Sequence, residues 1–172
     1  MNALGTRLLR LSPVEAAALI LFAASAALVG AWIFEAFGYL PCDLCLKQRQ
    51  PYYIGIPLAL IVTAITQRGS RGLVTAGFAA LALVFAASAA LGAYHAGVEW
   101  GLWQGPTACT GSSLPAAGGN LLEQLKDFKV VRCDEVAIRI LGLSLAGWNA
   151  LVSLAIAALA ARAAYGSSTE SQ

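Results

Sequence analysis

The sequence has few charged residues and almost no histidine, and both shortages exclude classes of protein. Only 12% of its 172 residues are charged, whereas 59% are apolar, a composition too apolar for an ordinary soluble domain of this length. A single histidine, His95, excludes any site built from several histidines. The Lys and Arg residues are scattered and the net charge is only +2, so no basic patch predicts a nucleic-acid partner. The class that remains is a polytopic membrane protein.

Four apolar stretches predict four membrane-spanning helices in a single all-α membrane domain. The predicted spans are residues 14–36, 44–66, 73–95 and 136–161. Each is long enough to cross a hydrocarbon core of about 30 Å at about 1.5 Å per residue. The first helix has a marked start, because Ser12-Pro13-Val14-Glu15 is a capping box. A cleaved signal peptide is the alternative for the first stretch, since Arg7 and Arg10 precede it.

Two loops, residues 37–43 and 96–135, would lie on the same side of the membrane. In the longer loop, Leu121, Leu125 and Phe128 share one helical face and predict a short helix on the membrane surface or packed against the protein. Five arginines on the opposite side are concentrated in short segments. The positive-inside rule therefore favours an outward orientation for these two loops.

All four cysteines fall in these loops or at the edge of one, as two pairs. Cys42 and Cys45 form a CxxC at the start of the second span, and 23 residues separate Cys109 from Cys133. A CxxC at a helix N-terminus favours a thiolate on Cys42 and lowers the pKa of one member of the pair. The residues alone leave three interpretations open: a redox relay, structural disulfides, and a four-cysteine zinc site. Zinc is disfavoured because only one pair has the usual ligand spacing.

Two further side chains are candidates for an electron-acceptor site. Arg49 lies four residues after Cys45, on the same helical stripe, where its guanidinium would stabilise a Cys45 thiolate or bind a carbonyl oxygen of a quinone. A quinone dissolves in the bilayer and accepts the two electrons that a dithiol loses. His95, near the outer end of the third span, is a second candidate contact. The alternatives are an arginine that reaches the head groups and a merely packed histidine.

Several short motifs occur together in the chain. They are Pro41-Cys42-x-x-Cys45 followed by Gln48-Arg49, then Tyr94-His95, then Gly105-Pro106-Thr107-Ala108-Cys109, and finally Cys133-Asp134. With four spans, this pattern resembles the DsbB family of quinone-coupled membrane thiol oxidoreductases. The resemblance implies a four-helix bundle in the bacterial inner membrane, with its cysteine loops facing the periplasm. It also implies an enzyme that reoxidises a DsbA-like thioredoxin-fold protein and passes the electrons to ubiquinone or menaquinone.

The resemblance assigns a role to each cysteine. Cys109 would be attacked by the partner's thiolate, and the released Cys133 would exchange with Cys42. Cys45 would become the thiolate that faces the quinone. Membrane lipid is an expected partner, and neither a metal nor nucleic acid is expected.

The resemblance also places Arg49 and His95 beside the quinone. Two other interpretations compete with it. One is a non-catalytic four-helix membrane protein whose disulfides brace its loops, for which Arg49 on the Cys45 stripe is unnecessary. The other is a vitamin K epoxide reductase-like oxidoreductase, in which the loop pair precedes the CxxC, whereas here the CxxC comes first.

Overall fold

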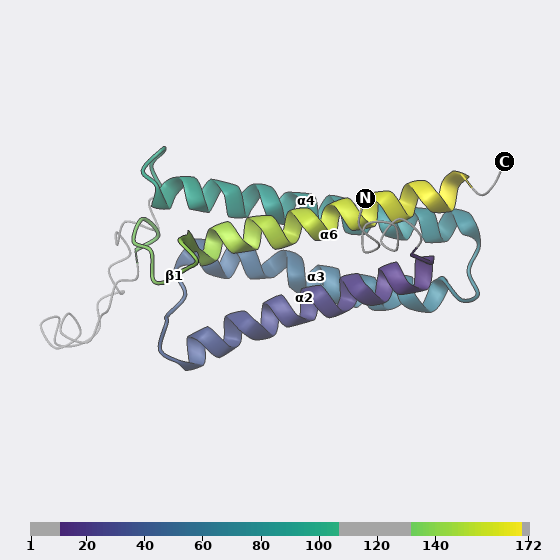
Figure 1. The fold of residues 1–172 in the computed structure, drawn as a ribbon, viewed down its shortest axis with the longest axis horizontal. Helices are drawn as coiled ribbons and strands as arrows, with labels where there is room; N and C mark the ends of the chain where they lie inside the picture. Colours follow the sequence, from purple (N-terminus) through teal and green to yellow (C-terminus); the bar gives the residue numbers. More distant parts are fainter. Residues whose placement is uncertain (1–10, 107–131, 170–172) are drawn as a thin grey trace, which may run out of the picture.

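The computed structural model describes residues 11–106 and 132–169. Within these ranges it has four long helices, α2 (Pro13–Ala36), α3 (Asp43–Ile65), α4 (Arg71–Glu99) and α6 (Leu145–Thr169), and two strands, β1 (Arg139–Ile140) and β2 (Leu143–Ser144). The helices run antiparallel to their neighbours along the chain and form an elongated bundle (Figure 1). The predicted helical architecture is confirmed. Cys109 and the surface helix predicted around Leu121 lie outside the described residues.

The connections that matter for function gather at one end of this bundle. The segment 37–42, the end of α4 and the β1–β2 hairpin lie at that end, and the start of α2, the α3–α4 turn and the end of α6 lie at the other (Figure 1). The described ends of the chain are therefore on the side away from the CxxC, as four alternating helices predict.

Side-chain caps fix where three of the helices begin. The Ser12 hydroxyl accepts from the backbone N–H of Glu15, whose carboxylate accepts from the Ser12 N–H at 2.8 Å, so the predicted capping box is present. Ser70 caps α4 in the ordinary way. Cys42 caps α3 through its sulfur, which places a potentially reactive atom at a helix N-terminus.

Small residues let the helices approach one another closely. A Cβ on Gly92 of α4 would lie 2.8 Å from the backbone nitrogen of Ala150 in α6. Between α3 and α4, Gly55 leaves room for the ring of Phe85, which meets Tyr52 edge-on with ring centroids 5.5 Å apart. Close packing of this kind holds membrane helices together. Lipid is as apolar as the helix surfaces, so the hydrophobic effect does not favour contact between helices over contact with lipid.

The outer surface of the bundle is apolar, as expected of a protein surrounded by lipid. One large side chain from each helix illustrates this, with exposed fractions between 58% and 73%: Phe22, Leu60, Leu83 and Leu154. Among the described helices, α2, α4 and α6 are long and apolar enough to cross a membrane. Large exposed apolar surfaces are unusual in soluble proteins, so these exposed side chains and the three apolar helices support the membrane class.

The helix α3 does not belong to that group of three. Its first two turns carry Asp43, Lys47, Gln48 and Arg49, which lower its average hydropathy. Two of these charges neutralise each other, because the Lys47 ammonium lies 2.7 Å from the Asp43 carboxylate. The membrane span predicted over residues 44–66 therefore stays a prediction.

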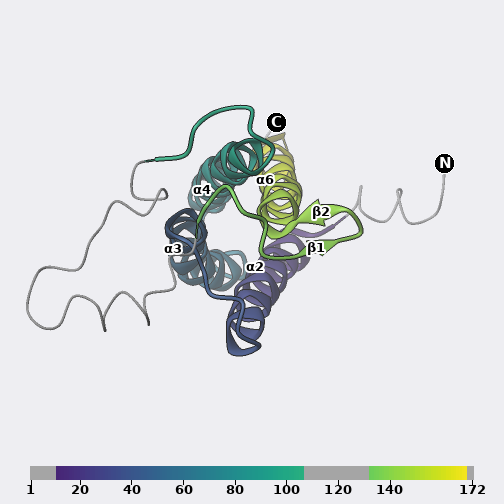
Figure 2. The same ribbon diagram turned by 90° about the vertical axis from the view of Figure 1, so that its left-hand side faces the viewer.

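The last helix begins later than the sequence predicted. The apolar run from Val136 predicted a helix from that residue, but α6 begins at Leu145, so this boundary is wrong. In its place β1 pairs antiparallel with β2 (Figure 2). The turn between them uses Leu141 and Gly142, with φ values of +53° and +83°, as in the tight turns of two-residue hairpins. The hairpin leads the chain from Cys133 across the end of the bundle into α6.

The close approach of α4 and α6 predicts a clear effect of substitution at Gly92. Gly92→Ala should destabilise the protein by about 1–3 kcal/mol, because the added methyl group meets the backbone of Ala150. Gly30→Ala in α2 is the matched control, since a Cβ there meets nothing within 4 Å. Thermal unfolding of both variants in detergent, followed by circular dichroism, checks the prediction. Equal melting temperatures for the two variants would contradict it.

Candidate active site

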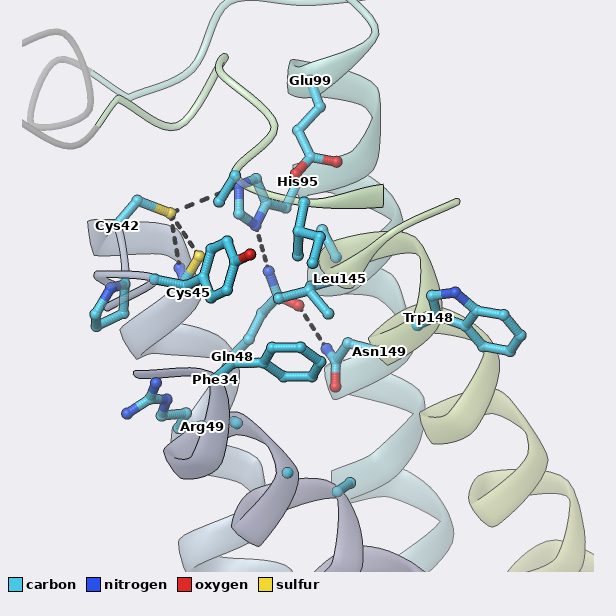
Figure 3. A pocket seen from close by; sticks show the side chains of 18 of the residues that line it. Phe34, Cys42, Cys45, Gln48, Arg49, His95, Glu99, Leu145, Trp148 and Asn149 are labelled. Carbon is cyan, nitrogen blue, oxygen red and sulfur yellow. Dashed lines mark hydrogen bonds between the residues drawn. The ribbon is translucent and has the colours of Figure 1, made fainter. Parts of the chain in front are cut away.

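Two free cysteines occupy the first turn of α3. The Cys42 sulfur accepts a hydrogen bond from the backbone N–H of Cys45 at 3.2 Å. The two Sγ atoms lie 2.7 Å apart (Figure 3), compared with about 2.05 Å in a disulfide. The predicted position of the CxxC at the helix start is confirmed. The pair is arranged to form and break a disulfide with little movement.

A buried histidine lies against the first of these sulfurs. His95 of α4 is 2% exposed, and its Nε2 lies 3.7 Å from the Sγ of Cys42. The backbone of Cys133 is also a hydrogen-bonding neighbour of the ring. His95 is thus in contact with members of both cysteine pairs, a placement that the sequence did not predict.

The surroundings of Cys42 favour its thiolate form. The largest influence on its pKa is the hydrogen bond from the Cys45 thiol, which burial opposes and the His95 bond reinforces. Together they lower the pKa of Cys42 from 9.0 to about 5. Because the thiolate is the nucleophile in disulfide exchange, the lowered pKa favours the reactive form of Cys42.

The second cysteine pair reaches the same place. Cys133 is disulfide-bonded and 1% exposed, in a buried cluster with Cys42, Leu44 and Val98. Cys109, the remaining cysteine of the sequence, lies outside the described residues. The segment that carries Cys133 therefore packs at the N-terminus of α3, where exchange with Cys42 would have to occur.

An apolar cavity of about 380 Å³ opens beside the two sulfurs. Its walls come from all four helices and from the segments that precede α3 and α6, and side chains such as Phe34 and Leu145 point toward it (Figure 3). Besides the cysteines and the aromatic residues, seven polar side chains line it: Gln48, Arg49, His95, Glu99, Arg132, Glu135 and Asn149. A cavity of roughly 300–1,000 Å³ with apolar walls and a few convergent polar groups is typical of a small-molecule site.

Arg49 lines this cavity, but its described partner is an acid and not a sulfur. Its guanidinium donates to the carboxylate of Glu35 in α2 at 2.6 Å, and its side chain is 12% exposed. The sequence placed Arg49 on the Cys45 stripe and offered two roles for it, a contact with the Cys45 thiolate or with a carbonyl oxygen of a quinone, whereas the structure pairs it with an acid of another helix. The only signal for Glu35 was an acid at the end of an apolar run. A role for Arg49 toward a ligand in the cavity stays a prediction.

Sequence reasoning also missed two amide side chains. Gln48 Nε2 lies 2.5 Å from Nδ1 of His95, and Asn149 Nδ2 donates to Gln48 Oε1 at 2.6 Å. Asn149 carried a usable signal, because a polar residue inside a membrane helix needs a partner and is often functional. Glu99, one turn after His95, carried no motif and also lines the cavity.

Three of these side chains have the donor atoms of metal ligands. The ligand atoms of Cys42, Cys45 and His95 lie within 4.8 Å of one another. Zinc sites with a purely structural role use four protein ligands, and within residues 11–106 and 132–169 only these three converge. The four-cysteine zinc site is not supported, because Cys133 is disulfide-bonded. That no metal binds here stays a prediction.

Comparison with known families decides between the remaining interpretations. A family model described as disulfide bond formation protein DsbB matches residues 14–163, a range that contains all four cysteines. This chain belongs to the DsbB family. The resemblance noted from the motifs is confirmed, and the vitamin K epoxide reductase-like alternative is set aside. Membership in the DsbB family gives the chain a disulfide-forming oxidoreductase role, and DsbB proteins are generally linked to quinones.

One bacterial relative of this DsbB-family chain is similar over most of its length. RP370, an uncharacterized protein of Rickettsia prowazekii (strain Madrid E), is 29% identical over 140 residues. The similarity covers 79% of this chain and 76% of the relative. No solved structure matches the chain.

The lowered pKa of Cys42 predicts how its reactivity depends on pH. In the reduced protein with Cys109→Ser and Cys133→Ser, alkylation of Cys42 by iodoacetamide should be fast at neutral pH. It should slow as the pH falls through about 5, where the thiolate gains a proton. In a further Cys45→Ala variant this fall should move to higher pH, because the largest cause of the lowered pKa is removed. Mass spectrometry of the Cys42 peptide gives the rates. A midpoint near 8.5 in the protein that keeps Cys45, as in an ordinary thiol, would contradict the assignment.

Proposed function

We propose that this protein reoxidises a DsbA-like thioredoxin-fold protein in the periplasm by disulfide exchange and passes the electrons to a membrane quinone. The observation that carries the proposal is the contact between the two cysteine pairs. The disulfide-bonded Cys133 is buried beside Cys42, and Cys42 and Cys45 line an apolar cavity. A disulfide donor and an electron-acceptor site are thus adjacent to the same sulfur.

In the first exchange, a thiolate of the partner attacks Cys109 of a Cys109–Cys133 disulfide. A mixed disulfide with the partner forms, and Cys133 leaves as a thiolate. The second thiol of the partner then attacks the mixed disulfide, which releases Cys109 and leaves the partner oxidised. One disulfide has been broken and one formed, so the two electrons now lie on Cys109 and Cys133.

The second exchange moves these electrons to the CxxC pair. The Cys133 thiolate attacks Cys42 in a Cys42–Cys45 disulfide, and Cys45 leaves. Cys109 then attacks Cys133, which releases Cys42 and restores the Cys109–Cys133 disulfide. Cys42 and Cys45 are now both reduced. This end state corresponds to the described one, with Cys42 and Cys45 free and Cys133 disulfide-bonded.

The cavity suits a quinone as the electron acceptor. Its apolar walls match a ring that dissolves in the bilayer, and the sulfurs of the CxxC lie at its edge. When bound, a quinone supplies an acceptor for two electrons and two protons. Arg49 and His95 both line the cavity. Arg49 would hold a carbonyl oxygen of the quinone through charge and hydrogen bonding, and His95 would lie beside the ring. The half-buried Cys45 carries the second sulfur on this wall, and oxidation of the two thiols to the Cys42–Cys45 disulfide releases the electrons.

The direction of the chain in the membrane follows from its charges and its chemistry. Disulfide exchange needs an oxidising compartment, and the described α3–α4 turn, which contains the basic residue Arg68 and leads to Arg71, lies at the end of the bundle away from the cysteines. Both favour a bacterial inner membrane with the cysteine end at the periplasm. In this arrangement α3 crosses the membrane with the other three helices. Ile54, Leu60 and Ile61 on its outer face, each more than half exposed, would contact lipid.

Quinone reduction by the purified protein tests the proposal. With a reduced thioredoxin-fold partner and ubiquinone or menaquinone in detergent, the wild type should turn over. Cys45→Ser and Cys109→Ser should reduce quinone consumption to background, because each breaks the path of exchange. Thr66→Ser, at the far end of α3, is the control and should keep full activity. Absence of turnover in the folded wild type with both quinones would overturn the proposal, as would activity in Cys45→Ser.

Arg49 predicts a separable effect on the quinone. Arg49→Gln should raise the KM for quinone about tenfold, which corresponds to roughly 1.4 kcal/mol, and should leave disulfide exchange with the partner unchanged. Arg68→Gln, at the opposite end of the bundle, is the matched control. Glu35→Gln should lower the KM or leave it unchanged, because it removes the carboxylate that occupies the guanidinium. Steady-state kinetics at varied quinone concentration measure these values. An unchanged KM in Arg49→Gln would exclude the contact.

A further inference from the structure

A continuous series of hydrogen bonds connects the interior of the bundle to the Cys42 sulfur. Tyr52 donates to Asn149 Oδ1 at 2.6 Å, and Asn149 Nδ2 donates to Gln48 Oε1 at 2.6 Å. Gln48 Nε2 lies 2.5 Å from His95 Nδ1, and His95 Nε2 lies 3.7 Å from Cys42 Sγ. Figure 3 shows the part from Asn149 to the sulfur. Three helices contribute to the series, so it also ties α3, α4 and α6 together.

The chemistry of the amides gives the series one direction. An amide NH₂ only donates and an amide oxygen only accepts. Because Asn149 Oδ1 accepts from Tyr52, its NH₂ faces Gln48 and requires the Gln48 oxygen there. The Gln48 NH₂ is then left to face His95. Rotating either amide alone by 180° would place like groups of Asn149 and Gln48 against each other and lose the hydrogen bond between them.

This direction decides where the imidazole carries its proton. The ring nitrogen that faces the Gln48 NH₂ has to accept, so Nδ1 is unprotonated. A neutral imidazole then carries its proton on Nε2, the nitrogen that faces Cys42. An imidazolium would direct an Nδ1–H at an NH₂ group. The burial of His95 and Gln48, which are 2% and 6% exposed, keeps water from relieving such a mismatch.

We propose that Gln48, Asn149 and Tyr52 are positioning residues that hold His95 neutral, with its proton on Nε2 directed at the sulfur of Cys42. The sulfur then has three donors when Cys42 is a thiolate: the backbone N–H of Cys45, the thiol of Cys45, and the His95 ring. The proposal deepens the proposed function and rests on it, since it names what prepares Cys42 for exchange. The other ionisable side chains that line the same cavity are Arg49, Glu99, Arg132 and Glu135.

The single histidine of the chain makes a direct test possible. Protein labelled with ¹⁵N in histidine gives the signals of one imidazole, so nitrogen NMR in detergent at neutral pH reads the protonation of both ring nitrogens of His95. The reduced wild type should have a protonated Nε2 and an unprotonated Nδ1. A proton on Nδ1, or a doubly protonated ring, would overturn the proposal. This measurement needs neither quinone nor partner, so its failure is distinguishable from failure of the proposed function.

Isosteric variants test the role of the amides. Gln48→Glu puts an acceptor against Nδ1, so the proton should move to Nδ1. Asn149→Asp should have the same effect although residue 149 is two hydrogen bonds away from the ring. The aspartate no longer donates to the Gln48 oxygen, so Gln48 turns its NH₂ toward residue 149 and its oxygen toward the ring. In both variants alkylation of Cys42 at pH 6 should slow several-fold. Ring signals identical to the wild type in both folded variants would overturn the proposal.

A tyrosine pair supplies the matched control. Tyr52→Phe removes the hydroxyl that orients Asn149, and it should produce a mixture of the two ring tautomers. Tyr53→Phe alters the adjacent exposed residue, which is 49% exposed, and should leave the wild-type signals unchanged. Equal spectra for Tyr52→Phe and Tyr53→Phe would remove Tyr52 from the series. If the amide variants fail to fold, the wild-type tautomer and this pair still decide the proposal.

Discussion

The contact between the N-terminus of α3 and the outer part of α4 is the constraint on which the cysteine end depends. The first backbone N–H groups of a helix have no partners within the helix, and near a membrane water is a poor substitute. Here the Cys42 sulfur accepts one of them and faces His95 of α4. The segment of Cys133 packs onto the same point. The cavity is the space that this arrangement leaves between α3, α2 and α6.

Because the chain has few charged residues, its few buried polar groups are informative about function. Much of the described core is built from alanine, leucine and phenylalanine. Four of the buried polar side chains lie along one hydrogen-bonded path between α3, α4 and α6: Gln48, Ser88, His95 and Ser153. Such groups are costly in an apolar interior unless each is satisfied. These groups lead to the cysteines and lie away from the lipid-facing surface, which indicates a role in the chemistry of the site.

Local sequence signals predicted the helices, the first cap and the site of the CxxC, because each depends on residues a few positions apart. The apolar run around Val136 misled the prediction, since a two-residue turn at Leu141 and Gly142 leaves no periodicity to detect. The Arg49–Glu35 pair and the Gln48–Asn149 bond join different helices. The spacing of residues along the chain does not predict such contacts. The proximity of Cys133 to Cys42 was predicted only through the family resemblance.

The three donors on the Cys42 sulfur have a thermodynamic consequence for the pair it forms with Cys45. Any group that stabilises the thiolate stabilises the reduced pair, and this raises the reduction potential of the corresponding disulfide by about 30 mV for each 1.4 kcal/mol. A disulfide of higher potential withdraws electrons more strongly from an upstream dithiol. The same stabilisation makes the reduced pair a weaker reductant, so the polar surroundings of one sulfur determine how oxidising the final acceptor must be.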